Sequence, residues 1–125
     1  MILVTGGAGF IGSHTCVALA QVGMPFLILD NFCNSRRSVP ERLARITGAA
    51  PAIVEGDVRD AALLQRLFAE YPISAVIHFA GLKAVGESVR EPLRYYDNNV
   101  AGSLALLQAM QAAGVRTLVF SSSAT

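Results

Sequence analysis

The stretch Thr5-Gly6-Gly7-Ala8-Gly9-Phe10-Ile11-Gly12 decides the fold of this chain, because it joins an apolar run to a helical one. Its glycines satisfy two spacings, Gly7-x-Gly9-x-x-Gly12 and Gly6-x-x-Gly9-x-x-Gly12. Glycine permits the positive φ of a tight turn and lets the backbone approach a pyrophosphate, which the free N–H groups at the start of the helix can bind. The stretch therefore predicts a strand, a phosphate-binding turn and a helix. An ordinary tight turn is the alternative.

A carboxylate that fits such a turn stands further along the chain. Asp30 ends the next apolar run 18 positions after Gly12, and the ribose-binding acid of a dinucleotide site is expected about 20 residues on. Its charge would accept hydrogen bonds from the ribose hydroxyls and repel a 2′-phosphate, so NAD is favoured over NADP. Arg36 and Arg37 favour NADP, since an arginine can hold that phosphate, but loop arginines are more often solvated.

On either side of the turn, apolar runs rich in β-branched residues alternate with helical stretches, as in βαβ units. We predict five strands, which are Ile2 to Thr5, Phe26 to Leu29, Ala52 to Glu55, Ala75 to Phe79 and Thr117 to Phe120. The predicted helices are Ile11 to Val22, Ala61 to Ala69 behind an Asp60 cap, and about Leu93 to Ala113. Right-handed crossovers then give an α/β fold, a doubly wound parallel sheet of Rossmann type with strand order 3-2-1-4-5. Its crevice lies beyond the carboxyl ends of strands 1 and 4.

Apolar residues at helical spacing predict the faces that pack on the sheet. They are Leu63, Leu64, Leu67 and Phe68 in the second predicted helix, and Val100, Leu104, Leu107 and Met110 in the long one. The polar stretch from Cys33 to Pro40 is predicted to be a surface loop.

Composition excludes several classes of protein. The 125 residues are 53% apolar and 15% charged, with a net charge of +1, which fits one soluble domain and gives no surface for nucleic acid. Cys16 and Cys33 form no metal-ligand spacing and predict neither a metal site nor disulfide staples, so we expect a reducing, cytoplasmic compartment. We expect no signal peptide before Ile2 and no membrane span, because the most apolar window is broken by polar residues, glycines and Pro25.

Two further strand ends carry candidate site residues. Asp57 follows the third strand, where it either accepts from an adenine amino group or caps the next helix. Phe79-Ala80-Gly81 follows the fourth strand, where small residues would let the backbone lie against a cofactor. His78 is predicted to be a packed histidine rather than a base, because titratable residues within buried strands are more often structural.

These motifs together resemble those of the UDP-glucose 4-epimerases, a group of extended short-chain dehydrogenases. The glycine turn is common to that whole superfamily, whereas the run after the fourth strand and the serine triplet are more specific. The matching stretches are 4 to 14, Leu29-Asp30-Asn31, Val76 to Ser88 with Gly81-Leu82-Lys83-Ala84-Val85-Gly86-Glu87-Ser88, Tyr95-Tyr96-Asp97-Asn98-Asn99-Val100, and Phe120-Ser121-Ser122-Ser123-Ala124-Thr125. Related sugar-nucleotide dehydratases usually have an acidic pair near Ser123 and no lysine at position 83.

The resemblance implies interconversion of UDP-glucose and UDP-galactose, a step of galactose metabolism, through a 4-keto sugar on tightly bound NAD. It implies that Phe10 and Ile11 meet the pyrophosphate beside Gly6 and Gly9, while Gly12 lets the helix approach the strand closely. It also implies that Asp30 meets the ribose, and that Asn31, Phe32, Cys33, Asn34 and Ser35 form the rim of the adenosine pocket. It places Asp57 and Val58 beside the adenine, and Phe79, Ala80, Gly81, Lys83 and Asn98 along the cofactor, although Asn98 could also be a solvated amide. Ser123 would contact the sugar 4-oxygen and relay its proton, unless it only caps the next turn.

The resemblance also implies that the catalytic Tyr-x-x-x-Lys pair and the sugar-binding domain lie beyond Thr125. Tyr95 and Tyr96 cannot replace that tyrosine, because neither has a lysine four positions later. We therefore expect residues 1–125 to be an incomplete NAD-binding domain that is inactive alone. Uncovered apolar area near the fourth and fifth strands should make it associate or aggregate. The longer enzyme would be a homodimer that takes a UDP-sugar. A non-catalytic NAD-binding module, or another NAD-dependent dehydratase or decarboxylase of sugar nucleotides, is the alternative.

Overall fold

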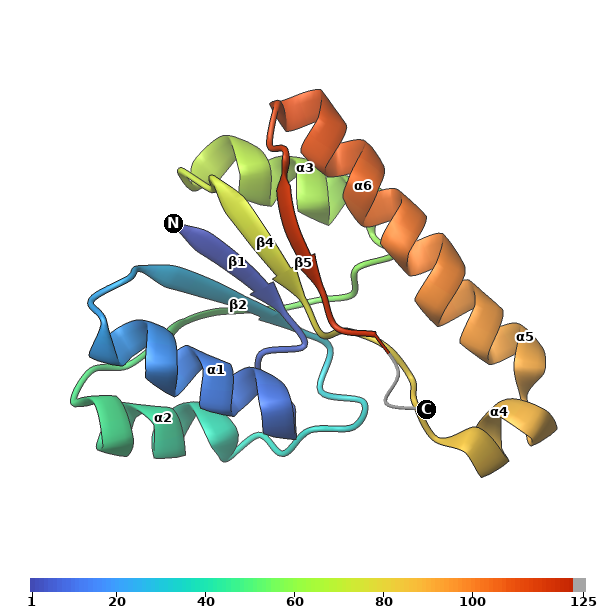
Figure 1. The fold of residues 1–125 in the computed structure, drawn as a ribbon, viewed down its shortest axis with the longest axis horizontal. Helices are drawn as coiled ribbons and strands as arrows, with labels where there is room; N and C mark the ends of the chain where they lie inside the picture. The colour runs from blue at the N-terminus through green and yellow to red at the C-terminus, as the bar shows by residue number, and fades with distance from the viewer. Residues whose placement is uncertain (123–125) are drawn as a thin grey trace.

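The computed structural model describes residues 1–122 and contains one parallel sheet of five strands. The strands are β1 (Ile2–Thr5), β2 (Phe26–Asp30), β3 (Ala52–Glu55), β4 (Ala75–His78) and β5 (Thr117–Phe120). They lie in the order β3-β2-β1-β4-β5 (Figure 1), which confirms the predicted topology. The register places Thr5 beside Leu29 on one side and beside His78 on the other, so the strand ends meet at one edge of the sheet.

Helices connect the strands and cover both faces of the sheet. They are α1 (Phe10–Gln21), α2 (Val39–Thr47), α3 (Ala61–Glu70), α4 (Val85–Arg90), α5 (Pro92–Tyr95), the π-helix η1 (Tyr96–Ala101) and α6 (Gly102–Ala113). Figure 1 shows α1 and α2 together on one side of the sheet and α3 with α6 on the other, while α4 and α5 project away from it. None of the helices within the described residues is long and apolar enough to span a membrane.

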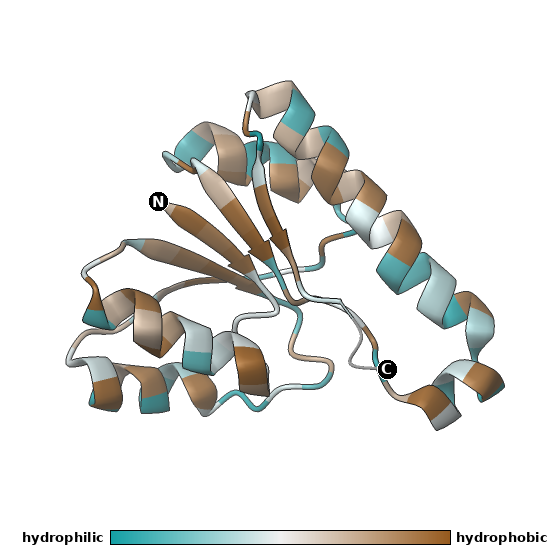
Figure 2. Ribbon diagram, in the orientation of Figure 1, coloured by the Kyte–Doolittle hydropathy of each residue, from teal (hydrophilic) through white to brown (hydrophobic). Residues whose placement is uncertain are grey.

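Alternation along the strands divides the core between the two faces of the sheet. Leu3 and Val76 pack with α3 and α6 on one face, whereas Val4 and Ile28 pack with α1 and α2 on the other. The strands are correspondingly brown along much of their length in Figure 2. Because a parallel sheet is buried on both faces, its strands show apolar runs rather than strict alternation, as the sequence suggested.

The predicted packing face of the second helix, α3, is correct, whereas that of the long helix is correct only at Met110, and Val100 is 59% exposed. Leu63, Leu64 and Leu67 are buried, with Phe68 packed partly against them, as predicted. On α6, by contrast, Leu104 and Leu107 are 54% and 47% exposed. The buried stripe consists of Gly102, Leu106 and Met110, with Ala105 and Ala109 packed against the same cluster. Both stripes of α6 are apolar, so periodicity alone could not identify the one that meets the sheet.

Several predicted boundaries also change. The long helix predicted from Leu93 to Ala113 is divided into α5, η1 and α6. Two helices, α2 and α4, were not predicted, and α2 begins at Val39 inside the expected surface loop. Both contain proline or glycine, Pro40 and Gly86, residues that weaken a helical pattern although proline is tolerated in a first turn. The apolar area expected near the fourth and fifth strands is present on β5, where Val119 and Phe120 are each 57% exposed.

Candidate functional site

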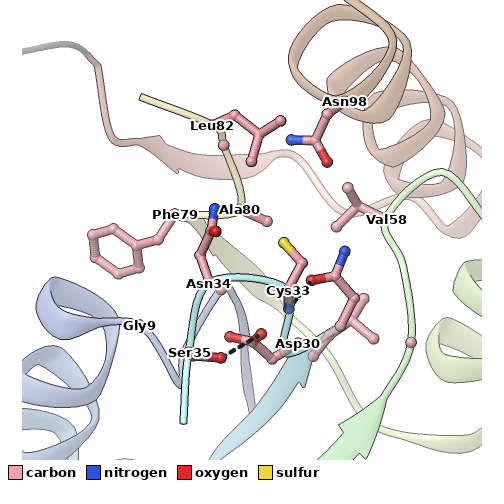
Figure 3. Close-up of a pocket in the computed structure, with 15 residues that line it drawn as sticks. Gly9, Asp30, Cys33, Asn34, Ser35, Val58, Phe79, Ala80, Leu82 and Asn98 are labelled. Carbon is pink, nitrogen blue, oxygen red and sulfur yellow. Dashed lines mark hydrogen bonds between the residues drawn. The ribbon is translucent and has the colours of Figure 1, made fainter. Parts of the chain in front are cut away.

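A pocket lies where the carboxyl ends of β1, β2, β3 and β4 meet the π-helix (Figure 3). In Figure 3, Asp30 and Ser35 stand at one end of this pocket, and Leu82 and Asn98 stand at the other. Its lining includes twelve of the predicted site residues, which are Gly6, Gly9, Asp30, Asn31, Cys33, Asn34, Ser35, Val58, Phe79, Ala80, Gly81 and Asn98. Residues that are 92 positions apart in the chain, Gly6 and Asn98, thus line one crevice, as the strand order predicts.

The glycine turn closes tightly against the protein and leaves its outer side open. Gly6 has a φ of +69°, and a Cβ atom there would lie 2.7 Å from the Ala80 nitrogen. A Cβ atom on Gly12 would overlap the Gly6 carbonyl oxygen and lie 2.8 Å from the Gly7 Cα atom. Gly9 precedes α1 and borders the pocket, and its Cβ atom would meet only the Gly6 carbonyl oxygen within 4 Å. The turn therefore gives a bare backbone cradle at the start of a helix, which fits a phosphate.

Asp30 is fixed in this cradle by three donors. Its Oδ2 atom accepts from the Ala8 amide at 2.9 Å, and its Oδ1 atom accepts from the Phe32 amide at 2.8 Å and the Ser35 hydroxyl at 3.1 Å. The residue is 8% exposed and lines the pocket. The carboxylate predicted from its spacing to Gly12 therefore contacts the glycine turn directly, and its orientation does not depend on a ligand.

The residues around Arg37 lie outside this pocket. Phe32, predicted at the rim, adopts a left-handed φ of 56° and does not line it. The Arg37 guanidinium lies 5.1 Å from the Phe32 ring centroid and donates to both carboxylate oxygens of Glu55. Arg36 borders a separate groove between α1 and α2. Neither arginine lines the pocket that contains Asp30. This agrees with the interpretation that they are loop arginines and do not hold a 2′-phosphate.

Asp57 does not line the pocket, although Gly56 and Val58 on either side of it do, and its neighbours hold its side chain. Its carboxylate accepts from the Arg59 amide, from the Arg59 guanidinium at 2.9 and 2.7 Å, and from the Asn31 amide at 3.0 Å. These bonds, those from Arg59 above all, hold the pKa of Asp57 well below its usual range. Val58 next to it is buried and lines the pocket. The cap of α3 is Asp60, as predicted, since its side chain accepts from the Leu63 amide.

The segment after β4 forms a wall that two pockets share. Phe79, Ala80, Gly81 and Leu82 line both the pocket with Asp30 and a second pocket beside it. Ile11 and Lys83, predicted cofactor contacts, line this second pocket and not the pocket with Asp30, as do Ser121 and Ser122. The Lys83 ammonium donates to the Ser121 hydroxyl at 3.0 Å and to its carbonyl oxygen at 3.3 Å. Phe10 is 82% exposed and borders the groove between α1 and α2, and Ser123 lies outside the described residues.

Sequence reasoning missed the groups that hold this wall. Asn99 accepts from the Leu82 amide and donates to the Leu82 carbonyl oxygen, both at 2.8 Å. Asn98 is 8% exposed, so it is not a solvated amide, and it donates to Asn99 at 3.0 Å. Both asparagines belong to η1, and π-turns are frequent at functional sites. Among the other lining residues that were missed, Leu29 and Gly56 could have been found because both stand at strand ends.

His78 is packed within the sheet, as predicted. It is 4% exposed and lies between Thr5 and Ser103, with its ring centroid 5.7 Å from that of Phe120. Burial, with a smaller contribution from the Lys83 charge, lowers the pKa of His78 to about 4. The imidazole is therefore neutral at pH 7, and its low proton affinity makes it a poor candidate for a general base in this position.

Comparison with known proteins assigns the family. Residues 2–125 match the family described as "Epimerase: NAD dependent epimerase/dehydratase family". The chain belongs to this family. It is 61% identical to the UDP-glucose 4-epimerase of Yersinia pestis over 124 residues, which are 99% of this chain and 37% of that protein. It is 56% identical to a UDP-glucose 4-epimerase of Klebsiella pneumoniae, covering 99% of this chain and 89% of that protein.

A solved structure of the same family has the same fold. The UDP-glucose 4-epimerase of Bifidobacterium longum, crystallised in complex with NAD+ and UDP, superposes with a TM-score of 0.96 at 52% identity. The match covers 98% of this chain and 37% of that one. Apart from the Klebsiella pneumoniae protein, the relatives named here are therefore almost three times as long as the chain, which corresponds to their amino-terminal part.

Proposed function

We propose that this chain is the NAD-binding part of a UDP-glucose 4-epimerase, the enzyme that interconverts UDP-glucose and UDP-galactose. One observation carries the proposal. The Asp30 carboxylate is bonded to the glycine turn through the Ala8 amide, in a crevice where a bare helix start meets the carboxyl ends of the strands. A turn that presents free amides supports a pyrophosphate, and an acid fixed beside it supports the adenosine ribose of NAD.

Residue roles are those that the resemblance to the UDP-glucose 4-epimerases implies. We assign the pyrophosphate to Gly6 and Gly9 with the first residues of α1, Phe10 and Ile11, while Gly12 lets the helix approach the strand closely. Asp30 binds the ribose, and the adenosine end is bordered by Asn31, Phe32, Cys33, Asn34, Ser35, Asp57 and Val58. Phe79, Ala80, Gly81, Lys83 and Asn98 line the rest of the cofactor, and Ser123 contacts the sugar. When bound, NAD would supply hydride-transfer chemistry at carbon 4 of the sugar, and these residues would bind and orient the two molecules.

The second pocket is a suitable place for the reacting end of the cofactor. It shares the wall 79–82 with the adenosine pocket and contains Lys83 and Ser121. We propose that the UDP-sugar enters from this side, and that a longer protein forms a homodimer. A cytoplasmic location belongs to the same proposal, because Cys16 and Cys33 are both free thiols.

Titration calorimetry with NAD tests the binding site. We expect Asp30→Asn to weaken NAD binding roughly tenfold or more, because the variant loses a charged acceptor for the ribose hydroxyls. Glu41→Gln is the matched control: its carboxylate lies on the surface of α2 in an exposed pair with Arg45, so NAD affinity should not change. Equal affinity of the wild type for NADP, or unchanged affinity in Asp30→Asn, would contradict the assignment.

Turnover of UDP-galactose separates the epimerase from its alternatives. No tyrosine of the 125 residues has a lysine four positions later, since Lys83 is the single lysine. A positioned tyrosine with a lowered pKa is the base that such a reaction requires near neutral pH. We therefore expect the 125-residue chain to bind NAD without converting UDP-galactose to UDP-glucose, and a protein that continues into a Tyr-x-x-x-Lys segment to convert it. Release of water or carbon dioxide by the longer protein would favour a dehydratase or decarboxylase.

A further inference from the structure

The wall formed by residues 79–82 is held at both ends by hydrogen bonds. Near its start, the Ala80 amide donates to the Thr5 hydroxyl at 3.5 Å. At its end, Leu82 exchanges two hydrogen bonds with the side chain of Asn99, each 2.8 Å long. Two elements that are far apart in sequence, β1 and the π-helix, therefore anchor the same four residues.

His78 joins these two anchors inside the protein. Its Nδ1 atom lies 2.5 Å from the Thr5 hydroxyl, and its Nε2 atom lies 3.2 Å from the Ser103 hydroxyl. Ser103 in turn donates to the Asn99 carbonyl oxygen at 2.6 Å. Thr5 is fully buried and His78 is 4% exposed, so water does not substitute freely for these partners. The hydrogen bonds form a closed circuit, that is, a continuous chain that begins at Ala80 and returns to the wall at Leu82.

The direction of each hydrogen bond in this circuit follows from the protons available. Ser103 gives its single hydroxyl proton to Asn99, so its oxygen can only accept from His78. His78 must then have its proton on Nε2, and its Nδ1 atom accepts from the Thr5 hydroxyl. That leaves the Thr5 oxygen free to accept from Ala80. Within residues 1–122, His78 is the only acceptor available to the Thr5 hydroxyl, so a proton on Nδ1 would leave this donor unpaired.

We propose that His78, as the neutral Nε2–H tautomer, is a positioning residue that fixes the wall 79–82 through Thr5 on one side and Ser103 with Asn99 on the other. His78 also borders the second pocket, although it is 4% exposed. Its effect on binding rests on the proposed function, because the wall is a surface for NAD only if the crevice holds NAD. The low pKa that burial gives His78 agrees with a neutral ring.

Nitrogen-15 NMR of the imidazole in the unaltered chain tests the tautomer without any substitution. The Nε2 nucleus should show a bonded proton and Nδ1 the shift of an unprotonated acceptor, at pH 7 and with or without NAD. An Nδ1–H tautomer or an imidazolium at pH 7 would overturn the proposal, because either reverses the circuit.

Two variants of Ser103 then test the effect on the wall. Ser103→Ala removes the hydroxyl, so the Leu82 amide should exchange with solvent at least about tenfold faster and NAD should bind several-fold more weakly. Ser103→Thr retains the hydroxyl and should restore both properties. Unfolding by urea, followed by circular dichroism, shows whether either variant is simply unfolded.

The results distinguish this inference from the proposed function. If the wild type does not bind NAD, the proposed function fails, while the tautomer and the exchange of Leu82 still decide the circuit. If NAD binds and Ser103→Ala leaves both NAD affinity and Leu82 exchange unchanged, the positioning role of His78 is wrong and the NAD site stands.

Discussion

Single residues at the glycine turn have little freedom, and Gly12 has the least. An added Cβ atom would meet the Gly6 carbonyl oxygen and the Gly7 Cα atom, both of them backbone that cannot move without opening the turn. Overpacking of this kind costs about 1–3 kcal/mol and sometimes more. We expect Gly12→Ala to lower the free energy of unfolding by about 3 kcal/mol in urea titrations and to weaken NAD binding.

The control for this prediction is Gly86→Ala in α4. Its added Cβ atom would find nothing nearer than the Arg90 Nη1 atom at 3.8 Å, and alanine is the better helix former. Stability should therefore stay the same or rise slightly. Equal losses in the two variants would show that the cost at Gly12 is not steric.

Among single residues, the sequence predicted those that stand at a characteristic distance from a motif along the chain. It missed those whose role depends on a contact that forms only in the folded protein. Asp30 follows from its distance to Gly12, and the crevice confirms its place near the turn. Asn99 stands at no such distance from a motif. Its importance comes from two hydrogen bonds to the backbone of Leu82, 17 positions away, which only the folded chain brings together.

At the scale of elements, α6 gives the sharpest test because two neighbouring leucines differ in burial. Leu106 is 1% exposed and belongs to the core, whereas Leu107 is 47% exposed. Leu106→Ala should lower the free energy of unfolding by about 2–5 kcal/mol, and Leu107→Ala by less than about 1 kcal/mol. Urea titrations of the two variants measure the difference, and equal costs would mean that α6 faces the sheet differently.

The elements that sequence could predict are those with one strong signal. All five strands were found, because short apolar runs rich in β-branched residues and bounded by turn residues are typical of buried strands. The face of α6 was not, since alanine and leucine occur on both of its sides. The π-helix was not either, because the same residues would also form a regular α-helix and only tertiary contacts select the wider turn.

For the whole molecule, buried His78 predicts how stability depends on pH. Its pKa is about 4 in the folded chain, against an ordinary value of 6.5. Between these values the unfolded chain binds a proton that the folded chain does not, so stability falls as the pH drops from 6.5 to 4, by up to roughly 3 kcal/mol. The lowered pKa of Asp57 adds a loss only at still lower pH, below its ordinary value of 3.8.

Urea titrations at several pH values between 7 and 4 measure this slope. The variant His78→Gln cannot titrate, and its stability should vary less with pH over this range, whatever its stability at pH 7. A wild-type chain with the same stability at pH 6.5 and pH 4.5 would contradict the prediction.

The apolar surface of the whole molecule predicts self-association. Leu93, Tyr96, Val100, Leu104 and Leu107 are between 47% and 81% exposed and follow one another at helical spacing. Exposed apolar side chains that gather on one surface drive association. Light scattering should find species larger than a monomer, and the double variant Leu104→Glu, Leu107→Glu should reduce them. Met24→Glu, which places one such charge on an exposed residue before β2, should not. A monodisperse wild-type monomer would argue against this surface as the cause.

The π-turn Tyr96–Ala101 joins α5 to α6 and changes which side of α6 continues the face of α5. Each residue of an α-helix advances the chain by about 100° around its axis, so one residue more or less within this turn changes which side chain points into the crevice. A relative that lost a single residue here would keep the sheet and the glycine turn intact, yet it would swing Asn98 and Asn99 away from their present partners. Short insertions and deletions between α5 and α6 thus offer a simple route by which such a protein could exchange the groups that meet its ligand without altering its framework.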